Sequence, residues 1–174
     1  MAKNDFFLKD VSENISIHRR LIELNPLINK AINLIYSSIS KGGKIMFCGN
    51  GGSAADAQHL SAELLVRLKP KINRRALPAI SLAQDTSTIT ACGNDYSFND
   101  IFVRPFEALA NKKDILFVIS TSGNSENILR VLKKAKRKKI ITIGLFGNKG
   151  GKSKNKCDVS IIVPSKITAR IQEC

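Results

Sequence analysis

Two short segments of the sequence are rich in glycine and in hydroxyl side chains. The first is Gly49-Asn50-Gly51-Gly52-Ser53, and the second is Ser120-Thr121-Ser122-Gly123-Asn124-Ser125. Small residues let backbone N–H groups approach an anion, and a helix that follows adds partial positive charge. The same residues also form ordinary turns and helix caps. Because two such segments occur, the pattern favours binding of a phosphate monoester.

Candidate acid–base residues follow the first segment. His59 and Glu63 are four residues apart, so on a helix they share one face, with Asp56 one turn earlier. An imidazole and a carboxylate on one face can hold a divalent metal ion or transfer protons. The same pair is also common as a surface hydrogen bond. Its position directly behind an anion-binding segment is what favours a functional role.

The first segment also fits the dinucleotide-binding pattern G-x-G-x-x-G/A, from Gly49 to Ala54. That pattern expects an acidic residue about 20 residues further on, at the end of the next strand, where it binds a ribose hydroxyl. The corresponding stretch reads LKPKINRR, which contains no acid, and Asp85 comes later than the pattern requires. The sequence therefore argues against NAD and predicts no nucleotide cofactor.

The elements that must position these residues alternate between apolar runs and helical segments. Continuous apolar runs are typical of strands that are buried on both faces of a parallel sheet. The intervening segments are long enough for right-handed crossovers. We expect an α/β fold, a three-layer αβα sandwich with about five parallel strands. The predicted strands are residues 44–48, 77–82, 115–120, 140–146 and 159–163.

A pair of helices is expected before the first strand. Asn25 followed by Pro26 predicts an N-cap and a first helical residue, and apolar residues at helical spacing continue to Gly42. Residues 5–24 predict a second, less regular amphipathic helix. We therefore divide the chain into N-terminal helices, residues 1–43, and a ligand-binding domain, residues 44–174, within a single structural unit.

Composition and charge exclude several classes of protein. Apolar residues make up 43% and charged residues 24%, as in ordinary globular proteins. No apolar run is long enough to cross a bilayer, and no signal-peptide pattern opens the chain, so we expect a cytoplasmic protein without a membrane partner. The net charge is +14, with its densest cluster at Lys133–Lys139. That cluster falls in the last turns of a predicted helix, where cations complement the helix dipole, so we expect no nucleic-acid partner.

Four blocks of the sequence occur in the order and spacing of a known family. They read CGNGGSAADAQHLSAEL, GNDYSFNDIF, ISTSGNSENIL and TARIQE, within residues 42–173. This pattern resembles the phosphoheptose isomerases of the sugar isomerase (SIS) domain superfamily. The resemblance implies conversion of sedoheptulose 7-phosphate to D-glycero-D-manno-heptose 7-phosphate, for the heptose of lipopolysaccharide core. It also implies a homotetramer with the N-terminal helices in the subunit contacts and active sites between subunits.

The resemblance also implies roles for individual residues. Glu63 would be the catalytic carboxylate, which moves a proton between adjacent carbons through an enediol. Some members bind one zinc ion per subunit, and His59, Glu63 and Gln172 match three of its ligands. Arg67 matches an arginine near the site. The positions implied to bind substrate are Asn50, Gly51, Gly52, Ser53, Glu63, Asn94, Asp95, Ser120, Thr121, Ser122, Ser125 and Gln172.

The same resemblance implies a last helix beyond Gln172, which carries a catalytic histidine that is also the fourth metal ligand. The sequence ends at Cys174 and contains only His18 and His59. A truncated, inactive isomerase is therefore one alternative. A non-catalytic SIS protein of the replication-initiator-binding type and a sugar-phosphate-sensing regulatory domain are two others. Those binding proteins tend to lack a carboxylate at the position of Glu63, so its presence favours the enzyme.

Overall fold

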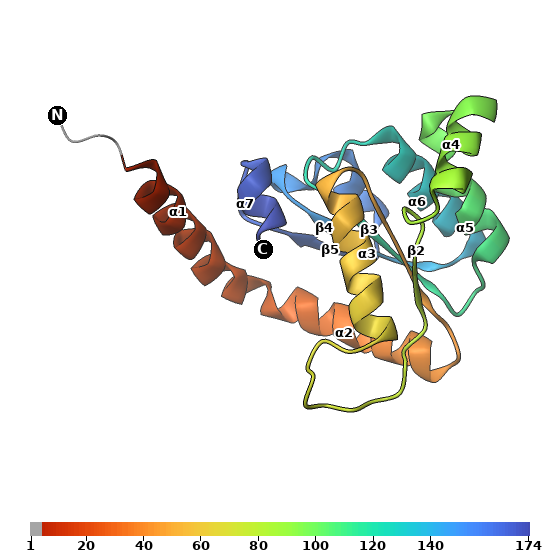
Figure 1. The fold of residues 1–174 in the computed structure, drawn as a ribbon, viewed down its shortest axis with the longest axis horizontal. Helices are drawn as coiled ribbons and strands as arrows, with labels where there is room; N and C mark the ends of the chain where they lie inside the picture. The colour runs from red at the N-terminus through yellow and green to blue at the C-terminus, as the bar shows by residue number, and fades with distance from the viewer. Residues whose placement is uncertain (1–4) are drawn as a thin grey trace.

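The five apolar runs form one parallel sheet. The computed structural model describes residues 5–174, and its sheet has the strand order β2-β1-β3-β4-β5 (Figure 1). All four neighbouring pairs of strands are parallel. The strand order reverses around β1, which is where open α/β sheets form their binding crevice. The strands are β1 (Ile45–Gly49), β2 (Ala79–Ser81), β3 (Ile115–Ser120), β4 (Ile141–Phe146) and β5 (Val159–Ile162).

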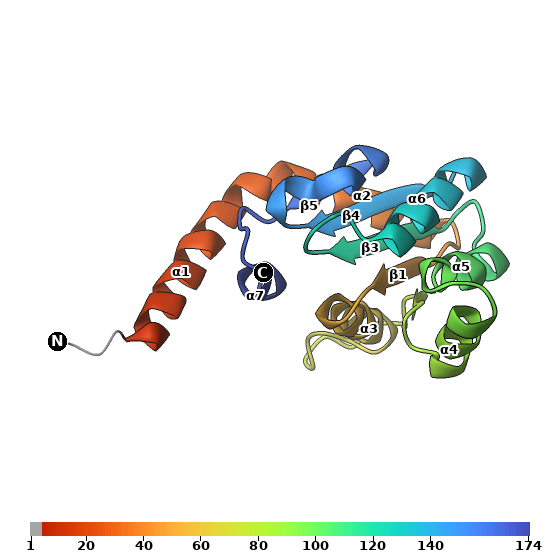
Figure 2. The same cartoon turned by 90° about the horizontal axis from the view of Figure 1, so that it is seen from above.

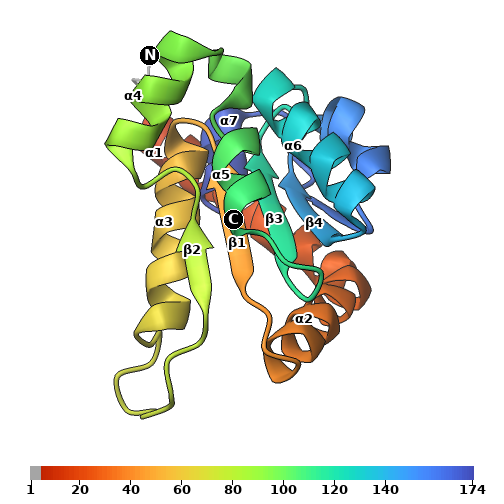
Figure 3. The ribbon, with the colours of Figure 1, turned by 90° about the vertical axis from the view of Figure 1, so that its right-hand side faces the viewer.

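Helices cover both faces of this sheet, which confirms the three-layer αβα prediction. The helices α4, α5 and α6 pack on one face, where Figure 3 shows α5 and α6 in front of the strands, and α2 and α3 pack on the other face. The α-helices are α1 (Phe6–Arg20), α2 (Asn25–Ser40), α3 (Gly52–Leu65), α4 (Thr86–Asp95), α5 (Val103–Leu109), α6 (Glu126–Lys138) and α7 (Thr168–Gln172). The 3-10 helices are η1 (Leu21–Leu24), η2 (Phe98–Asp100) and η3 (Asn148–Lys156).

Alternation along β1 explains why the strand is apolar throughout. Ile45 and Phe47 pack in a core with residues of α2 and α3, whereas Met46 and Cys48 pack in a second core with residues of α4, α5 and α6. Both sides of a central strand therefore need apolar side chains. Each fully buried aliphatic or aromatic side chain contributes about 1.5–3 kcal/mol, so β1 and β3 form a rigid base for the loops that follow them.

The N-terminal helices occupy the predicted part of the chain, with two corrections. The single helix expected over residues 5–24 is α1 (Phe6–Arg20) followed by the 3-10 helix η1 (Leu21–Leu24). We expected Asn25 to cap α2, but Asn25 is its first residue, and Leu24 occupies the cap position without a side-chain hydrogen bond. The reason is that η1 leads directly into α2, so Asn25 already has helical torsion angles. α1 extends away from the sheet (Figures 1 and 2), and Ile17 is the buried residue on it.

The basic cluster at Lys133–Lys139 lies at the end of α6, as predicted. Lys134 forms an ion pair with Glu107 of α5, and Lys138 donates to the Glu107 carbonyl oxygen at 2.7 Å. Part of the cluster thus joins α6 to α5. Across residues 5–174, no helix combines the length and the hydropathy needed to cross a membrane.

A buried carboxylate anchors the amino ends of β1 and β3. Asp114, which is 3% exposed, accepts from the backbone N–H groups of Lys44 at 3.0 Å and Asn111 at 2.8 Å. It also accepts from the Lys44 ammonium at 2.6 Å. These contacts fix the turns that enter the two strands, and the carboxyl ends of the same strands carry the glycine-rich and serine-rich segments.

Replacing Asp114 with Ala is expected to lower the free energy of unfolding by about 3–5 kcal/mol, because the buried donors lose their acceptor. The matched control is Lys134→Ala, which breaks an exposed ion pair and should cost less than about 1 kcal/mol. Urea unfolding of both variants measures the difference. Equal losses in the two variants would show that Asp114 is not an anchor.

Candidate active site

The glycine-rich and serine-rich segments leave the sheet side by side. Gly49, at the end of β1, is paired in register with Ile119, the penultimate residue of β3. The loop at residues 50–53 and the loop at residues 120–125 therefore start from adjacent positions at the carboxyl edge of the sheet. Each loop leads into a helix, α3 or α6. This is the edge at which open parallel sheets bind ligands.

The first loop presents backbone donors at the start of α3. Within residues 5–174, the N–H groups of Gly51 and Gly52 have no hydrogen-bond acceptor. The cap residue, Gly51, has no side chain that could accept from them, so these donors stay available to an anion. Ser53 is buried beside them. A side chain at position 52 would collide with the Gln172 amide, whose nitrogen lies 2.0 Å from the place of a Cβ atom.

The second loop is held by its own hydroxyl groups. Ser120 Oγ accepts from the Gly123 N–H, and Ser122 Oγ accepts from the Asn124 N–H, both at 3.1 Å. The N–H groups of Ser122 and Ser125 have no acceptor in the described part of the chain. They precede α6, a helix of 13 residues, whose dipole favours an anion at this end.

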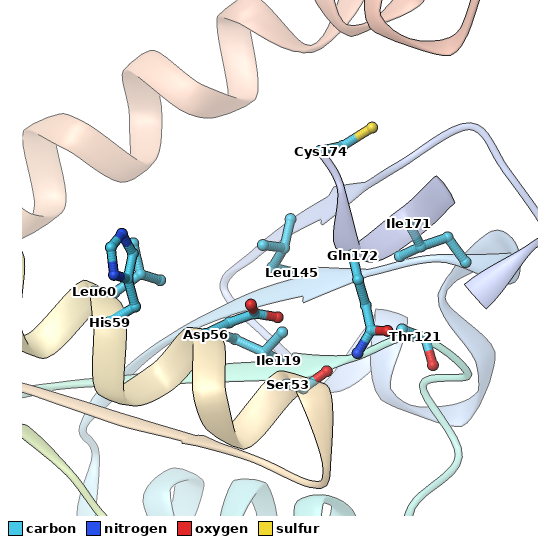
Figure 4. A pocket seen from close by; sticks show the side chains of 10 residues that line it. All are labelled: Ser53, Asp56, His59, Leu60, Ile119, Thr121, Leu145, Ile171, Gln172 and Cys174. Atoms are coloured by element: carbon cyan, nitrogen blue, oxygen red, sulfur yellow. The ribbon is translucent and has the colours of Figure 1, made fainter. Parts of the chain in front are cut away.

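A cavity of about 180 Å³ lies next to both loops (Figure 4). Its polar side is formed by Ser53, Asp56 and His59 of α3, together with Thr121 and Gln172. In Figure 4 the Gln172 side chain reaches from α7 toward Ser53 and Thr121, whereas His59 lies at the other end of the cavity. The remaining lining residues are Leu60, Ile119, Leu145, Ile171 and Cys174.

Glu63 and His59 face each other on α3, as their spacing predicts. Glu63 Oε1 lies 3.6 Å from His59 Nε2, which is too long for a hydrogen bond. Glu63 Oε2 is buried, and no donor within residues 5–174 reaches it. Leaving such an atom without a partner costs about 1–3 kcal/mol. The oxygen therefore has an unused acceptor site, although Glu63 is not among the residues that line the cavity beside the two loops.

Asp56 contributes a carboxylate to the cavity one turn before His59. Burial raises the pKa of Asp56 above its usual range, and the nearby His59 partly opposes that rise. The desolvation comes from apolar neighbours, because Leu60 and Ile119 line the same cavity. The carboxyl group of Asp56 therefore holds a proton to higher pH than an exposed aspartate does.

Asp85, the acid considered for a dinucleotide ribose, caps a helix instead. Its Oδ1 accepts from the N–H groups of Ser87 at 3.0 Å and Thr88 at 3.3 Å, at the start of α4. The hydrogen bond from the Thr88 hydroxyl is the main reason that the pKa of Asp85 is lowered. The side chain is thus engaged locally in capping α4.

Comparison with known proteins agrees with this geometry. A sequence model described as SIS domain matches residues 11–147. The phosphoheptose isomerase of a Nitratiruptor species is 53% identical over 151 residues, which cover 87% of this chain and 80% of that relative. The chain belongs to the phosphoheptose isomerases of the SIS domain family. The family inferred from the four sequence blocks is thereby confirmed.

Two solved phosphoheptose isomerases have the same fold. GmhA from Neisseria gonorrhoeae has a TM-score of 0.90 and 38% identity, over 97% of this chain and 90% of that chain. The enzyme from Francisella tularensis has a TM-score of 0.93 and 38% identity, over 99% and 92% of the two chains. Both cover the helices α1 and α2 together with the sheet, so the N-terminal helices are part of the phosphoheptose isomerase fold.

The structure separates other residues that the family resemblance singled out. Asn94 and Asp95, at the end of α4, are exposed and bonded to each other, with Asn94 Nδ2 donating to Asp95 Oδ1 at 2.8 Å. Neither lines the cavity beside the two loops. Gln172 packs against Gly52, near the start of α3, two helical turns before His59. For a divalent ion, the structure therefore brings His59 and Glu63 together and leaves Gln172 apart.

Two residues near the site were missed by sequence reasoning. Arg74 donates to the carbonyl oxygens of Glu63 at 2.5 Å and Leu64 at 2.9 Å, so it closes the end of α3, whereas Arg67 is exposed. Asn127, in the first turn of α6, is only 1% exposed and binds Asn50 of the first loop. A polar side chain in an otherwise apolar helical face was the available signal for Asn127.

Proposed function

We propose that this chain is an aldose–ketose isomerase that converts sedoheptulose 7-phosphate to D-glycero-D-manno-heptose 7-phosphate. The observation that carries the proposal is the adjacency of two donor-rich loops at the ends of β1 and β3, with an unpartnered carboxylate, Glu63, on the helix after the first loop. The loops suit a phosphate monoester, and the carboxylate suits proton transfer. The phosphoheptose isomerases among its relatives support the same reaction.

The reaction needs a base that serves two neighbouring carbons. The Glu63 carboxylate takes the proton from C1 of the ketose, a C1=C2 bond forms, and the C2 carbonyl oxygen gains a proton. The carboxyl group then returns a proton to C2, while the C1 hydroxyl loses its proton and becomes the aldehyde. The transfer between the two oxygens needs a second proton carrier, a role open to the His59 imidazole, 3.6 Å from Glu63. Backbone donors of the loops hold the phosphate and orient the sugar.

Turnover in D₂O tests this mechanism. Because the proton on Glu63 exchanges with solvent, we expect the aldose product to carry deuterium at C2, which ¹H NMR detects as a lost C2 signal. Turnover of unlabelled substrate in H₂O is the control. A fully protonated C2 in the D₂O product would contradict this prediction, because it would show that the proton delivered to C2 does not exchange with solvent.

We also propose that the chain forms a homotetramer whose contacts include the N-terminal helices. Phe6 and Phe7 are each 73% exposed, and exposed apolar side chains continue along α1, η1 and α2, which together form the N-terminal arm. Exposed apolar surface of this extent is typical of protein interfaces. Light scattering should give a mass four times the 19.1 kDa of one chain, and a monomer would contradict the proposal. The other exposed apolar residues of the arm are Leu8, Val11, Ile15, Ile22, Leu27, Ile28, Ile32 and Tyr36.

The remaining proposals concern metal, compartment and pathway. For zinc, we propose that His59 and Glu63 form a pair of ligands, whereas Gln172 lies apart from them. Two protein ligands are one fewer than catalytic zinc sites use, so we expect zinc to bind weakly. Calorimetric titration with zinc should show weak binding that His59→Ala abolishes, and unchanged binding would refute it.

We propose the cytoplasm as the compartment and lipopolysaccharide heptose as the end product. Cell fractionation and the lipopolysaccharide of a deletion strain test these two points.

A further inference from the structure

A pair of amides joins the two loops of the site. Asn50 Nδ2 donates to Asn127 Oδ1 at 3.0 Å, and Asn127 Nδ2 donates back to Asn50 Oδ1 at 2.8 Å. Asn50 is the first residue of the loop after β1, and Asn127 lies in the first turn of α6, directly after the loop at residues 120–125. We call this reciprocal pair the amide clamp.

We propose that Asn127 is a positioning residue for the isomerase reaction, which acts by holding the first loop against the second through the amide clamp. The inference rests on the proposed function. Asn127 is 1% exposed, so its side chain has no room to touch a substrate. Its Oδ1 also accepts from the Ile128 N–H at 2.9 Å, which fixes the orientation of the amide on α6.

The amide clamp also changes the role of Asn50. The side-chain oxygen of Asn50 accepts from Asn127 and its side-chain nitrogen donates to Asn127, so the side chain is turned toward α6. The open donors of the first loop are the backbone N–H groups of Gly51 and Gly52. The amide clamp then sets the position of these N–H groups relative to the loop at residues 120–125. A displacement of about 1 Å between groups that orient a substrate can reduce a rate by about 100-fold.

Asn127→Ala should therefore lower kcat by about 10–100-fold. Inorganic phosphate, used as a competitive inhibitor, tests anion binding without the sugar. The donors of the loop at residues 120–125 do not depend on the amide clamp, so the inhibition constant of phosphate should change less than about threefold. Asn127→Asp keeps the acceptor for Asn50 Nδ2 and for the Ile128 N–H, so it should recover part of the rate. The kcat of Asn50→Ala and that of the double variant should each be at most about threefold lower than the kcat of Asn127→Ala, because the two amides act as one unit.

The matched control is Asn29→Ala. Asn29 Nδ2 donates to Asn25 Oδ1 at 3.1 Å, which is also an amide–amide contact, but both residues are exposed on α2 and lie outside the site. This variant should keep the wild-type kcat. Amide hydrogen exchange at residues 50–54 provides a readout that does not need turnover, and Asn127→Ala should speed exchange there while Asn29→Ala should not.

Three outcomes would overturn the inference. The first is a folded Asn127→Ala variant with wild-type kcat. The second is independent, multiplicative losses from Asn50→Ala and Asn127→Ala. The third is unchanged exchange at residues 50–54. A wild-type chain that fails to isomerise the substrate would instead overturn the proposed function, and the exchange measurement would still decide whether the amide clamp orders the loop.

Discussion

Glu63→Gln is expected to lower kcat by about 10²–10⁴-fold, the usual contribution of a general acid–base group. The amide has nearly the same shape as the carboxylate but cannot accept a proton from a carbon acid at neutral pH. KM should stay within about threefold of wild type, because the loops at residues 50–53 and 120–125 still hold the phosphate. Steady-state kinetics with sedoheptulose 7-phosphate measure both constants.

The fold should not change in this variant. Glu63 Oε2 has no partner within residues 5–174, and Oε1 is 3.6 Å from a largely exposed His59, so little stabilising energy is lost. Glu23→Gln, an exposed change on η1, is the matched control and should keep wild-type kcat and stability. A kcat for Glu63→Gln within about threefold of wild type would remove Glu63 from the mechanism.

Gly123→Ala is expected to lower the free energy of unfolding and to displace the loop at residues 120–125. Gly123 has φ +64°, and a Cβ atom there would lie 2.1 Å from the carbonyl oxygen of Gly150 in η3. The left-handed backbone costs about 1–2 kcal/mol for Ala, and the clash with another backbone adds about 1–3 kcal/mol. Because the loop must move to relieve the clash, KM should rise by about tenfold, which corresponds to about 1.4 kcal/mol of lost binding.

Gly42→Ala separates the two causes. Gly42 has φ +80°, but nothing lies within 4 Å of its Cβ position, so this variant has the backbone strain without the clash. It should lose about 1–2 kcal/mol of stability and keep the wild-type KM. Urea unfolding and steady-state kinetics of both variants make the comparison. Equal losses of stability, with unchanged KM for Gly123→Ala, would show that contact with η3 does not shape the phosphate loop.

The sheet and both loops could be predicted from the sequence because their signals are local. A strand that is buried on both faces needs apolar side chains on both sides, as residues 115–119 of β3 show, and a loop that binds an anion through its backbone must use small residues. The spacing of His59 and Glu63 likewise fixes a shared helical face. These features depend on neighbours within a few residues, so they can be recognised from the sequence alone.

Other features depend on contacts between distant segments and could not be predicted. The partnership of Asn50 with Asn127 requires the register of β1 against β3, which brings residues 77 positions apart into contact. Arg74 reaches the end of α3 through an irregular loop, where its charge alone suggested only exposure. The failure of Asn25 as a cap has the same origin, since η1 supplies the entry into α2 that the Asn-Pro signal did not reveal.

The most direct test of the central claim is whether the purified chain turns sedoheptulose 7-phosphate into an aldose 7-phosphate. The predicted result is steady formation of D-glycero-D-manno-heptose 7-phosphate by the wild type and its loss, by about 10²–10⁴-fold, in Glu63→Gln. A folded wild-type chain that binds phosphate but leaves the ketose unchanged would contradict the assignment of an isomerase.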